Sequence, residues 1–239
     1  LNLGLLYINL TRYSAAEKCC RQAYKIYEKL AEKNSEAYEA NFAMSCHNLG
    51  NLYINLTRYS EAEKYCRQAY DKYSVLVGKN SEAYAHYLAI SCLNLGNLYS
   101  EQNRYIEAEE YYKRAYEIYK RIVEKNPTVY ELELGSACKN LTLMFMDTDR
   151  CEEAEKYSKQ AYEIYARLAN ANSSYYEPEL ADICIITAFA IGMSGNIEEA
   201  KEYCRKAMTV VKRMKERGED VGEREEQINE LLAMLDEEE

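Results

Sequence analysis

The sequence predicts an all-α fold in which pairs of helices stack into an α-solenoid. One observation is a repeat of 46 residues, marked by a small residue that recurs five times without a slip, at Ala16, Ala62, Ala108, Ala154 and Ala200. A second is composition: the 239 residues include 25 Tyr but only 9 Gly and 2 Pro, which indicates long helices and few turns. A fixed period of this length is typical of architectures in which each repeat packs on its neighbours.

Each repeat is expected to hold two helices. In the second repeat the first helix is expected from about Glu36 to Leu56, because apolar or small residues recur there in helical spacing. Thr57 and Arg58 form a short turn, and the second helix is expected from about Ser60 to Val77. Its apolar face comprises Ala62, Cys66, Ala69, Tyr70, Tyr73 and Leu76.

The links between repeats carry helix-start signals. Asparagine recurs at the repeat interval, as Asn34, Asn80, Asn126 and Asn172. Each is followed by Ser or, in one case, by Pro127, which suits a first helical turn. The Asn and Ser side chains can accept bonds from free helix-start N–H groups, so we expect capped helix starts here.

The repeat divides the chain into two regions. The motif begins near residues 1, 47, 93, 139 and 185, so residues 1–217 are expected to form the repeat array. The first repeat begins mid-motif at Leu1, which suggests a piece of a longer protein. After Gly218 the period stops, and residues 218–239 are expected to form a capping helix, from about Glu223 to Leu235, with an acidic tail.

The charge is unevenly distributed. The net charge is −10, and residues 219–239 contribute −9 of it through ten acidic side chains and Arg224, which leaves −1 for residues 1–218. Neither region offers a basic stripe, so nucleic-acid binding is not expected. No apolar run approaches a membrane span and no signal peptide is recognisable, so we expect no membrane association.

The nine cysteines follow the repeat rather than a metal or disulfide pattern. Most fall in two registers, Cys46, Cys92, Cys138 and Cys184 in one and Cys20, Cys66 and Cys204 in the other. With no CxxC spacing, we interpret them as small buried residues of successive layers in a reducing, cytoplasmic protein, and expect no metal and no cofactor.

Tyrosines recur in pairs three residues apart: Tyr24/Tyr27, Tyr70/Tyr73, Tyr116/Tyr119 and Tyr162/Tyr165. Spacing of three places each pair on one helical face. We expect the rings to pack between neighbouring layers with their hydroxyl groups at the rim, in preference to forming an aromatic ligand cage.

The small residues resemble those of the tetratricopeptide repeat. Gly4, Gly50 and Gly96 each stand twelve residues before a register alanine, and a tyrosine follows each glycine by three. The long repeats are similar to those of kinesin light chain and of prokaryotic multidomain signalling or defence proteins. The resemblance implies a right-handed superhelix of about five helix pairs, whose close helix crossings require the small residues.

The resemblance also implies where a partner binds, because in this family the first helix of each pair lines the concave surface. The residues expected there are His47, Asn48, Asn51, Asn55, Asn94, Asn97, Glu101, Lys139 and Asn140. A ladder of amides could hold the backbone of an extended peptide without reading its charge. The alternative is that these asparagines bond to neighbouring helices and only order the stack.

Enzyme chemistry is not expected. The two histidines, His47 and His86, lie 39 residues apart in different parts of their repeats, and no nucleophile or phosphate-binding motif is present. The predicted function is therefore protein–protein recognition by a scaffold or sensor arm. The alternative is an oligomerisation or structural spacer module of a larger multidomain protein, in which the first layer (Leu1, Leu3, Leu6) pairs with another subunit or with missing upstream repeats.

Overall fold

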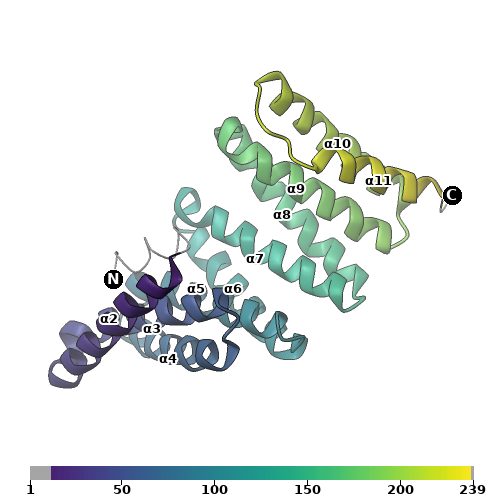
Figure 1. Ribbon diagram of the computed structural model, residues 1–239. Coiled ribbons are helices and arrows are strands. Elements are labelled where there is room, and N and C mark those ends of the chain that lie inside the picture. Colours follow the sequence, from purple (N-terminus) through teal and green to yellow (C-terminus); the bar gives the residue numbers. More distant parts are fainter. Residues whose placement is uncertain (1–11, 238–239) are drawn as a thin grey trace. The chain divides into compact units, whose positions relative to one another are not determined.

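The computed structural model describes residues 12–237, and these form ten α-helices and no strand (Figure 1). Residues 1–11, which include Gly4 and the leucines of the predicted self-association surface, lie outside the described part of the chain. The helices are α2 (Tyr13–Lys33), α3 (Ser35–Asn55), α4 (Tyr59–Lys79), α5 (Ser81–Ser100), α6 (Tyr105–Val123), α7 (Pro127–Asp147), α8 (Cys151–Ala171), α9 (Ser173–Met193), α10 (Ile197–Glu216) and α11 (Arg224–Glu237).

The chain divides into two compact units, Leu1–Ile118 and Tyr119–Glu239, here called unit 1 and unit 2. In unit 1, α3 packs on α2 and α4, and α5 packs on α4. In unit 2, α8 packs on α7 and α9, α10 packs on α9, and α11 lies against α9 and α10. Each unit is thus a stack of helices in which sequence neighbours are spatial neighbours, which confirms the all-α repeat fold.

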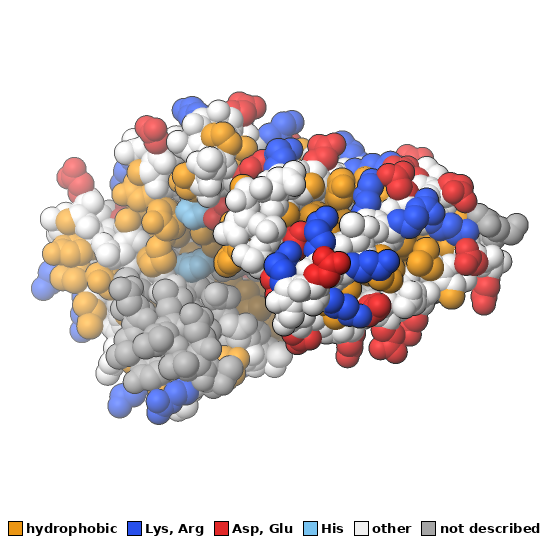
Figure 2. All heavy atoms as spheres, turned by 90° about the horizontal axis from the view of Figure 1, so that it is seen from above, with side chains coloured by type: hydrophobic (Ala, Val, Ile, Leu, Met, Phe, Trp, Pro, Cys, Tyr) orange, Lys and Arg blue, Asp and Glu red, His pale blue; other side chains and the backbone are white. Residues whose placement is uncertain are grey.

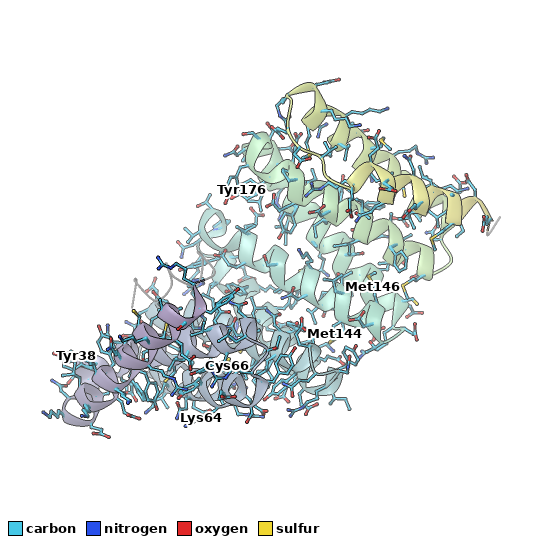
Figure 3. The ribbon with its side chains drawn as sticks, viewed as in Figure 1. Tyr38, Lys64, Cys66, Met144, Met146 and Tyr176 are labelled. Carbon is cyan, nitrogen blue, oxygen red and sulfur yellow. The ribbon has the colours of Figure 1, made fainter. Side chains whose placement is uncertain are left out.

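The register alanines are the centre of each layer. Ala16, Ala62, Ala108, Ala154 and Ala200 are all 0 % exposed. The motif glycines allow the two helices of a pair to approach closely: a Cβ on Gly50 would lie 2.5 Å from Sγ of Cys66, which Figure 3 labels, and one on Gly96 would lie 2.4 Å from the Tyr112 ring. The structure therefore confirms the packing role predicted for these residues.

The cysteines of both registers are buried, as predicted. Burial raises the pKa of Cys66, Cys92 and Cys138 to about 12, so these thiols stay protonated and unreactive near neutral pH. All nine cysteines are free thiols, and the described residues contain no cluster of three or more potential metal ligands.

The tyrosine prediction is confirmed for ring packing but not for every hydroxyl group. The ring of Tyr24 on α2 packs edge-on against that of Tyr65 on α4, with ring centroids 5.3 Å apart. The ring of Tyr70 on α4 packs in the same way against that of Tyr111 on α6, at 5.4 Å. Tyr73, however, is 2 % exposed, and its hydroxyl group is buried without a hydrogen-bond partner in the described part of the chain. The prediction that the hydroxyl groups lie at the rim is therefore wrong for Tyr73.

The asparagines at the links are all helix N-caps, but only two of them cap with the side chain. Asn34 Oδ1 accepts from the N–H of Ala37 (3.2 Å), and Asn80 Oδ1 accepts from that of Ala83 (3.0 Å). The side chains of Asn126 and Asn172 make no such bond, so side-chain capping was a wrong prediction for those two. In α7 the first turn instead carries Pro127, which has no N–H to satisfy.

In the described part of the chain, the turns inside four helix pairs have a left-handed residue at one fixed position. Thr57, Asn103, Asp149 and Gly195 succeed one another at the repeat interval, with φ of 55°, 57°, 54° and 80°. Asn, Asp and Gly tolerate this conformation, whereas a β-branched residue such as Thr57 is strained in it. The predicted turn at Thr57 and Arg58 is therefore confirmed, with strain at its first residue.

Candidate partner-binding surface

The first helices of the pairs, α3 and α5 in unit 1 and α7 and α9 in unit 2, carry the residues predicted to bind a partner. Within each unit these two helices contact one another, so equivalent positions lie on adjacent helices. We call the exposed and half-buried side chains of α3 and α5 the unit 1 surface, and those of α7 and α9 the unit 2 surface.

His47 and Asn94 form a polar pair that joins α3 to α5. The Nδ2 of Asn94 lies 3.3 Å from Nδ1 of His47. An amide NH₂ can only donate, so this geometry assigns Nδ1 as the acceptor and leaves the imidazole proton on Nε2. Burial, with a further contribution from nearby His86, lowers the pKa of His47 to about 4. His47 is therefore a neutral hydrogen-bonding group near pH 7.

His86 lies near His47, which the sequence interpretation did not predict. Figure 2 shows the two histidine side chains (pale blue) on the same face of unit 1, among mainly apolar neighbours (orange). The signal was present in the register: His86 corresponds to Ala40, which lies seven residues, or about two helical turns, before His47 on one helical face. The two histidines are 39 residues apart along the chain, but the repeat places them on the adjacent first helices α3 and α5.

Two of the predicted asparagines are engaged in packing. Asn48 is 1 % exposed, and neither of its amide atoms has a hydrogen-bond partner among residues 12–237. Asn97 Oδ1 accepts from the hydroxyl group of Tyr112 at 2.8 Å, which ties α5 to α6. Asn97 thus bonds to a neighbouring helix, as the stack-ordering alternative expects, whereas Asn48 is buried without such a bond to a described residue.

Three predicted residues of the unit 1 surface are open. Asn51 is half-buried, Asn55 and Glu101 are exposed, and none of the three side chains has a hydrogen-bond partner within the described residues. Asn55 ends α3 and Glu101 caps the end of α5, so both lie at the same end of their helices. Their free amide and carboxylate groups could pair with backbone N–H and C=O groups of an incoming segment.

The remaining predicted residues, Lys139 and Asn140, are half-buried on α7 and belong to unit 2. The unit 2 surface is otherwise more apolar than predicted for an amide ladder. Leu143 is 38 % exposed and Phe189 is 39 % exposed, and they occupy the register of Asn51 and Asn97. The structure thus distributes the predicted site over two surfaces of different chemistry.

Comparison with known protein families identifies the repeat. Tetratricopeptide repeat models match residues 1–30, 39–121 and 134–175, which together exceed half of the chain. The chain belongs to the tetratricopeptide repeat family. Membership in this family of interaction scaffolds supports a role in protein–protein interaction.

Solved structures show the same fold at low sequence identity. The apo form of RapI is 15% identical with a TM-score of 0.63, over 89% of this chain and 69% of that one. Aspartyl phosphate phosphatase F from Bacillus subtilis is 19% identical with a TM-score of 0.65, over 98% of this chain but only 58% of that one. BtubC from P. vanneervenii is 14% identical with a TM-score of 0.51, over 83% of this chain and 90% of that one. No protein of curated function matches the sequence.

Among the described helices, none combines the length and the apolar character needed to cross a membrane.

Proposed function

We propose that this chain is a non-enzymatic, cytoplasmic interaction module that binds an extended peptide or a segment of a partner protein on the unit 1 surface. The observation that carries the proposal is the open group of polar side chains there. The side chains of Asn51, Asn55 and Glu101 have no hydrogen-bond partner among residues 12–237, and the His47 imidazole on the same surface stays neutral near pH 7. Such groups recognise a peptide backbone by hydrogen bonds more than by charge.

The proposal also includes a division of the chain into a repeat array and a terminal capping helix. Residues 1–217 would provide the repeat array, and residues 218–239 would cover its last layer through α11. The contacts that support the second part are the ion pair of Arg224 Nε with Asp182 Oδ1 on α9 (2.6 Å) and the buried Ile228, Leu231 and Leu235. A terminal helix with one apolar and one polar face is what a repeat stack needs at its end.

The test compares two sets of substitutions in partner capture from the native host, followed by direct titration of the captured partner. Asn51→Ala, Asn55→Ala and Glu101→Ala together remove the open groups without touching a described hydrogen bond. Asn170→Ala and Asn229→Ala form the matched control, because both residues are exposed and lie on α8 and α11.

We expect the unit 1 variant to lose at least tenfold in affinity with an unchanged thermal midpoint, and the control to bind like wild type. Equal binding by the unit 1 variant, or equal weakening in both variants, would overturn the assignment of this surface.

A further inference from the structure

A cavity of about 390 Å³ opens among α2, α3 and α4 of unit 1. Its walls include the rings of Tyr24 and Phe42, whose centroids are 5.2 Å apart, and the carboxylates of Glu28 and Glu32. None of its lining residues belongs to the predicted partner-binding set. The cavity is therefore distinct from the residues proposed to bind a peptide, although one of its lining residues, Ser35, is an exposed residue of α3.

Other repeats show which side chains cover the tyrosine rings that are equivalent to Tyr24. Tyr24 meets Tyr65 edge-on in the same way that Tyr70 meets Tyr111 and Tyr162 meets Tyr203. In the latter two places a cation of the protein covers the first ring. Arg114 Cζ lies 5.1 Å from the Tyr70 centroid, and Lys206 Nζ lies 5.1 Å from the Tyr162 centroid.

At the cavity this cation is missing. The register position of Arg114 and Lys206 is held here by Gln68, and no Lys or Arg of the described residues lies over the Tyr24 ring. Gln160 also holds this register, but it belongs to unit 2, whereas the corresponding tyrosine, Tyr116, belongs to unit 1. We therefore compare the three rings whose covering residue lies in the same unit, which are those of Tyr24, Tyr70 and Tyr162.

The cavity beside Tyr24, where no cation covers the ring, also contains carboxylates that form no ion pair within the described residues. Glu28 Oε1 accepts from the Tyr24 hydroxyl group at 2.8 Å, and neither Glu28 nor Glu32 forms an ion pair within the described residues. The equivalent residues are Ser74 and Gly78 beside Tyr70, and Ala166 and Asn170 beside Tyr162. Where the protein supplies its own cation, these two positions carry no acidic side chain.

The lysine in the cavity wall is already engaged. Lys72 Nζ lies 3.3 Å from Glu39 Oε1, and Lys79 Nζ lies 3.1 Å from the other oxygen of the same carboxylate. Hydrogen bonds from these lysines and from Ser35 lower the pKa of Glu39, although its burial acts in the opposite direction. With two lysines on Glu39, the five charged side chains keep a net charge of −1, and Glu28 and Glu32 are the carboxylates of the cavity that form no ion pair within the described residues.

We propose that the cavity binds a basic side chain of a partner protein, arginine in preference to lysine. A guanidinium group would stack on the Tyr24 ring, as Arg114 does on Tyr70, and would direct its N–H donors to Glu28 and Glu32. Arginine suits the site because its planar head combines aromatic stacking with bidentate bonding to a carboxylate. This site goes beyond the proposed peptide surface, since its residues lie on other faces and select for charge.

The probe is the blocked tripeptide acetyl-Gly-Arg-Gly-amide, titrated into the full chain and followed by NMR shifts of the Tyr24 and Phe42 rings. Matched peptides carry lysine or citrulline, the latter being a neutral analogue of arginine with nearly the same shape. We expect saturable binding of the arginine peptide, weaker binding of the lysine peptide, and at least tenfold weaker binding of the citrulline peptide. Equal binding of arginine and citrulline would overturn the proposal.

Three variants locate the binding in the cavity. Gln68→Arg supplies the missing cation from within and should abolish binding of the arginine peptide, and Glu28→Gln with Glu32→Gln should weaken it at least tenfold. Gln22→Arg is the matched control, because Gln22 occupies the same register one repeat earlier, is exposed, and does not line the cavity. Wild-type affinity in the Gln68→Arg or Glu28→Gln/Glu32→Gln protein would place the arginine elsewhere and refute the assignment.

Discussion

Unit 1 and unit 2 are built on one repeat, yet the same positions carry different chemistry in each. On the first helices, Asn51 and Asn97 of unit 1 are replaced in register by Leu143 and Phe189, both more than a third exposed, in unit 2. The register alanines, in contrast, are fully buried in both units. Positions that form a layer are held by packing, whereas positions that face outward can exchange polar for apolar groups.

At one repeated contact between layers, unit 1 again has a polar group that unit 2 lacks. In unit 1 the hydroxyl group of Tyr99 donates to Glu63 (2.9 Å), which Arg104 also binds (3.2 Å). Tyr53, Glu17 and Arg58 repeat this arrangement one layer earlier. In unit 2 the position of Tyr99 is Phe145, which has no hydroxyl group to donate, and Arg150 still stacks on its ring, 4.4 Å from the centroid. The hydroxyl bond can be lost while the stack of the arginine on the ring persists.

The largest effect is expected from filling the register alanine, and it should be the same in both units. Ala62→Leu and Ala154→Leu each force a larger side chain into a fully buried helix crossing, which should cost about 3 kcal/mol of the affected unit's unfolding free energy. Hydrogen exchange of peptides from each unit would measure the cost separately. A cost in only one unit would show that the layers are not equivalent.

A pH effect should distinguish the units, because both histidines lie in unit 1. The pKa of His47 is about 4 in the folded chain against 6.5 unfolded, so the unfolded state takes up the proton first as pH falls below 6.5. Unit 1 should therefore lose up to about 2 kcal/mol between pH 7 and pH 5.

The matched variant for this effect is His47→Leu, which copies Leu93 from the next repeat. We expect its urea-unfolding free energy to change less between pH 7 and pH 5 than that of wild type. An equal loss in both proteins would show that His47 does not titrate in this way.

Removal of the helix caps should affect unit 1 more than unit 2. Asn80→Ala deletes the bond to the N–H of Ala83 and should cost about 1 kcal/mol, whereas Asn172→Ala deletes no such bond and should cost much less. Thermal unfolding of the two variants would measure this difference. Equal losses would mean that Asn172 stabilises its helix start by another route.

The smallest effect is expected from exchanging the left-handed turn residues. Thr57→Gly should relieve strain in unit 1 and stabilise it by about 0.5 kcal/mol, because part of the gain is offset by the greater freedom of glycine in the unfolded chain. Gly195→Thr should destabilise unit 2 by a similar or larger amount. Denaturant titrations of both variants provide the check, and a loss of stability in Thr57→Gly would show that the threonine side chain has a role of its own.

Much of the fold was predictable, because packing in a repeat depends on local period. The expected helix from Glu36 to Leu56 is observed as Ser35–Asn55, and that from Ser60 to Val77 as Tyr59–Lys79. Side-chain capping by Asn126 and Asn172 was not correctly predicted, because the same residue type at the same position can turn its amide elsewhere. Capping depends on local rotamers, which the sequence period does not determine.

The candidate site was less predictable. Sequence alone could not separate Asn48, which is buried, from Asn55, which is exposed, although they stand on the same helix. Nor did it show that His86 lies near His47, or that Gln68 leaves Tyr24 without the cation found over Tyr70. Each of these facts depends on the contacts of one repeat with the next.

By itself, the sequence determined the repeat, its helices and the residues that form the layers. The physical reason is that a small residue every 46 positions permits one close crossing in each pair, and burial of the helical apolar faces follows from it. Only the tertiary structure decided which polar side chains remain available. That outcome depends on the neighbour each side chain meets: the hydroxyl group of Tyr112 donates to Asn97, whereas the side chains of Asn51 and Asn55 meet no hydrogen-bond partner in the described part of the chain.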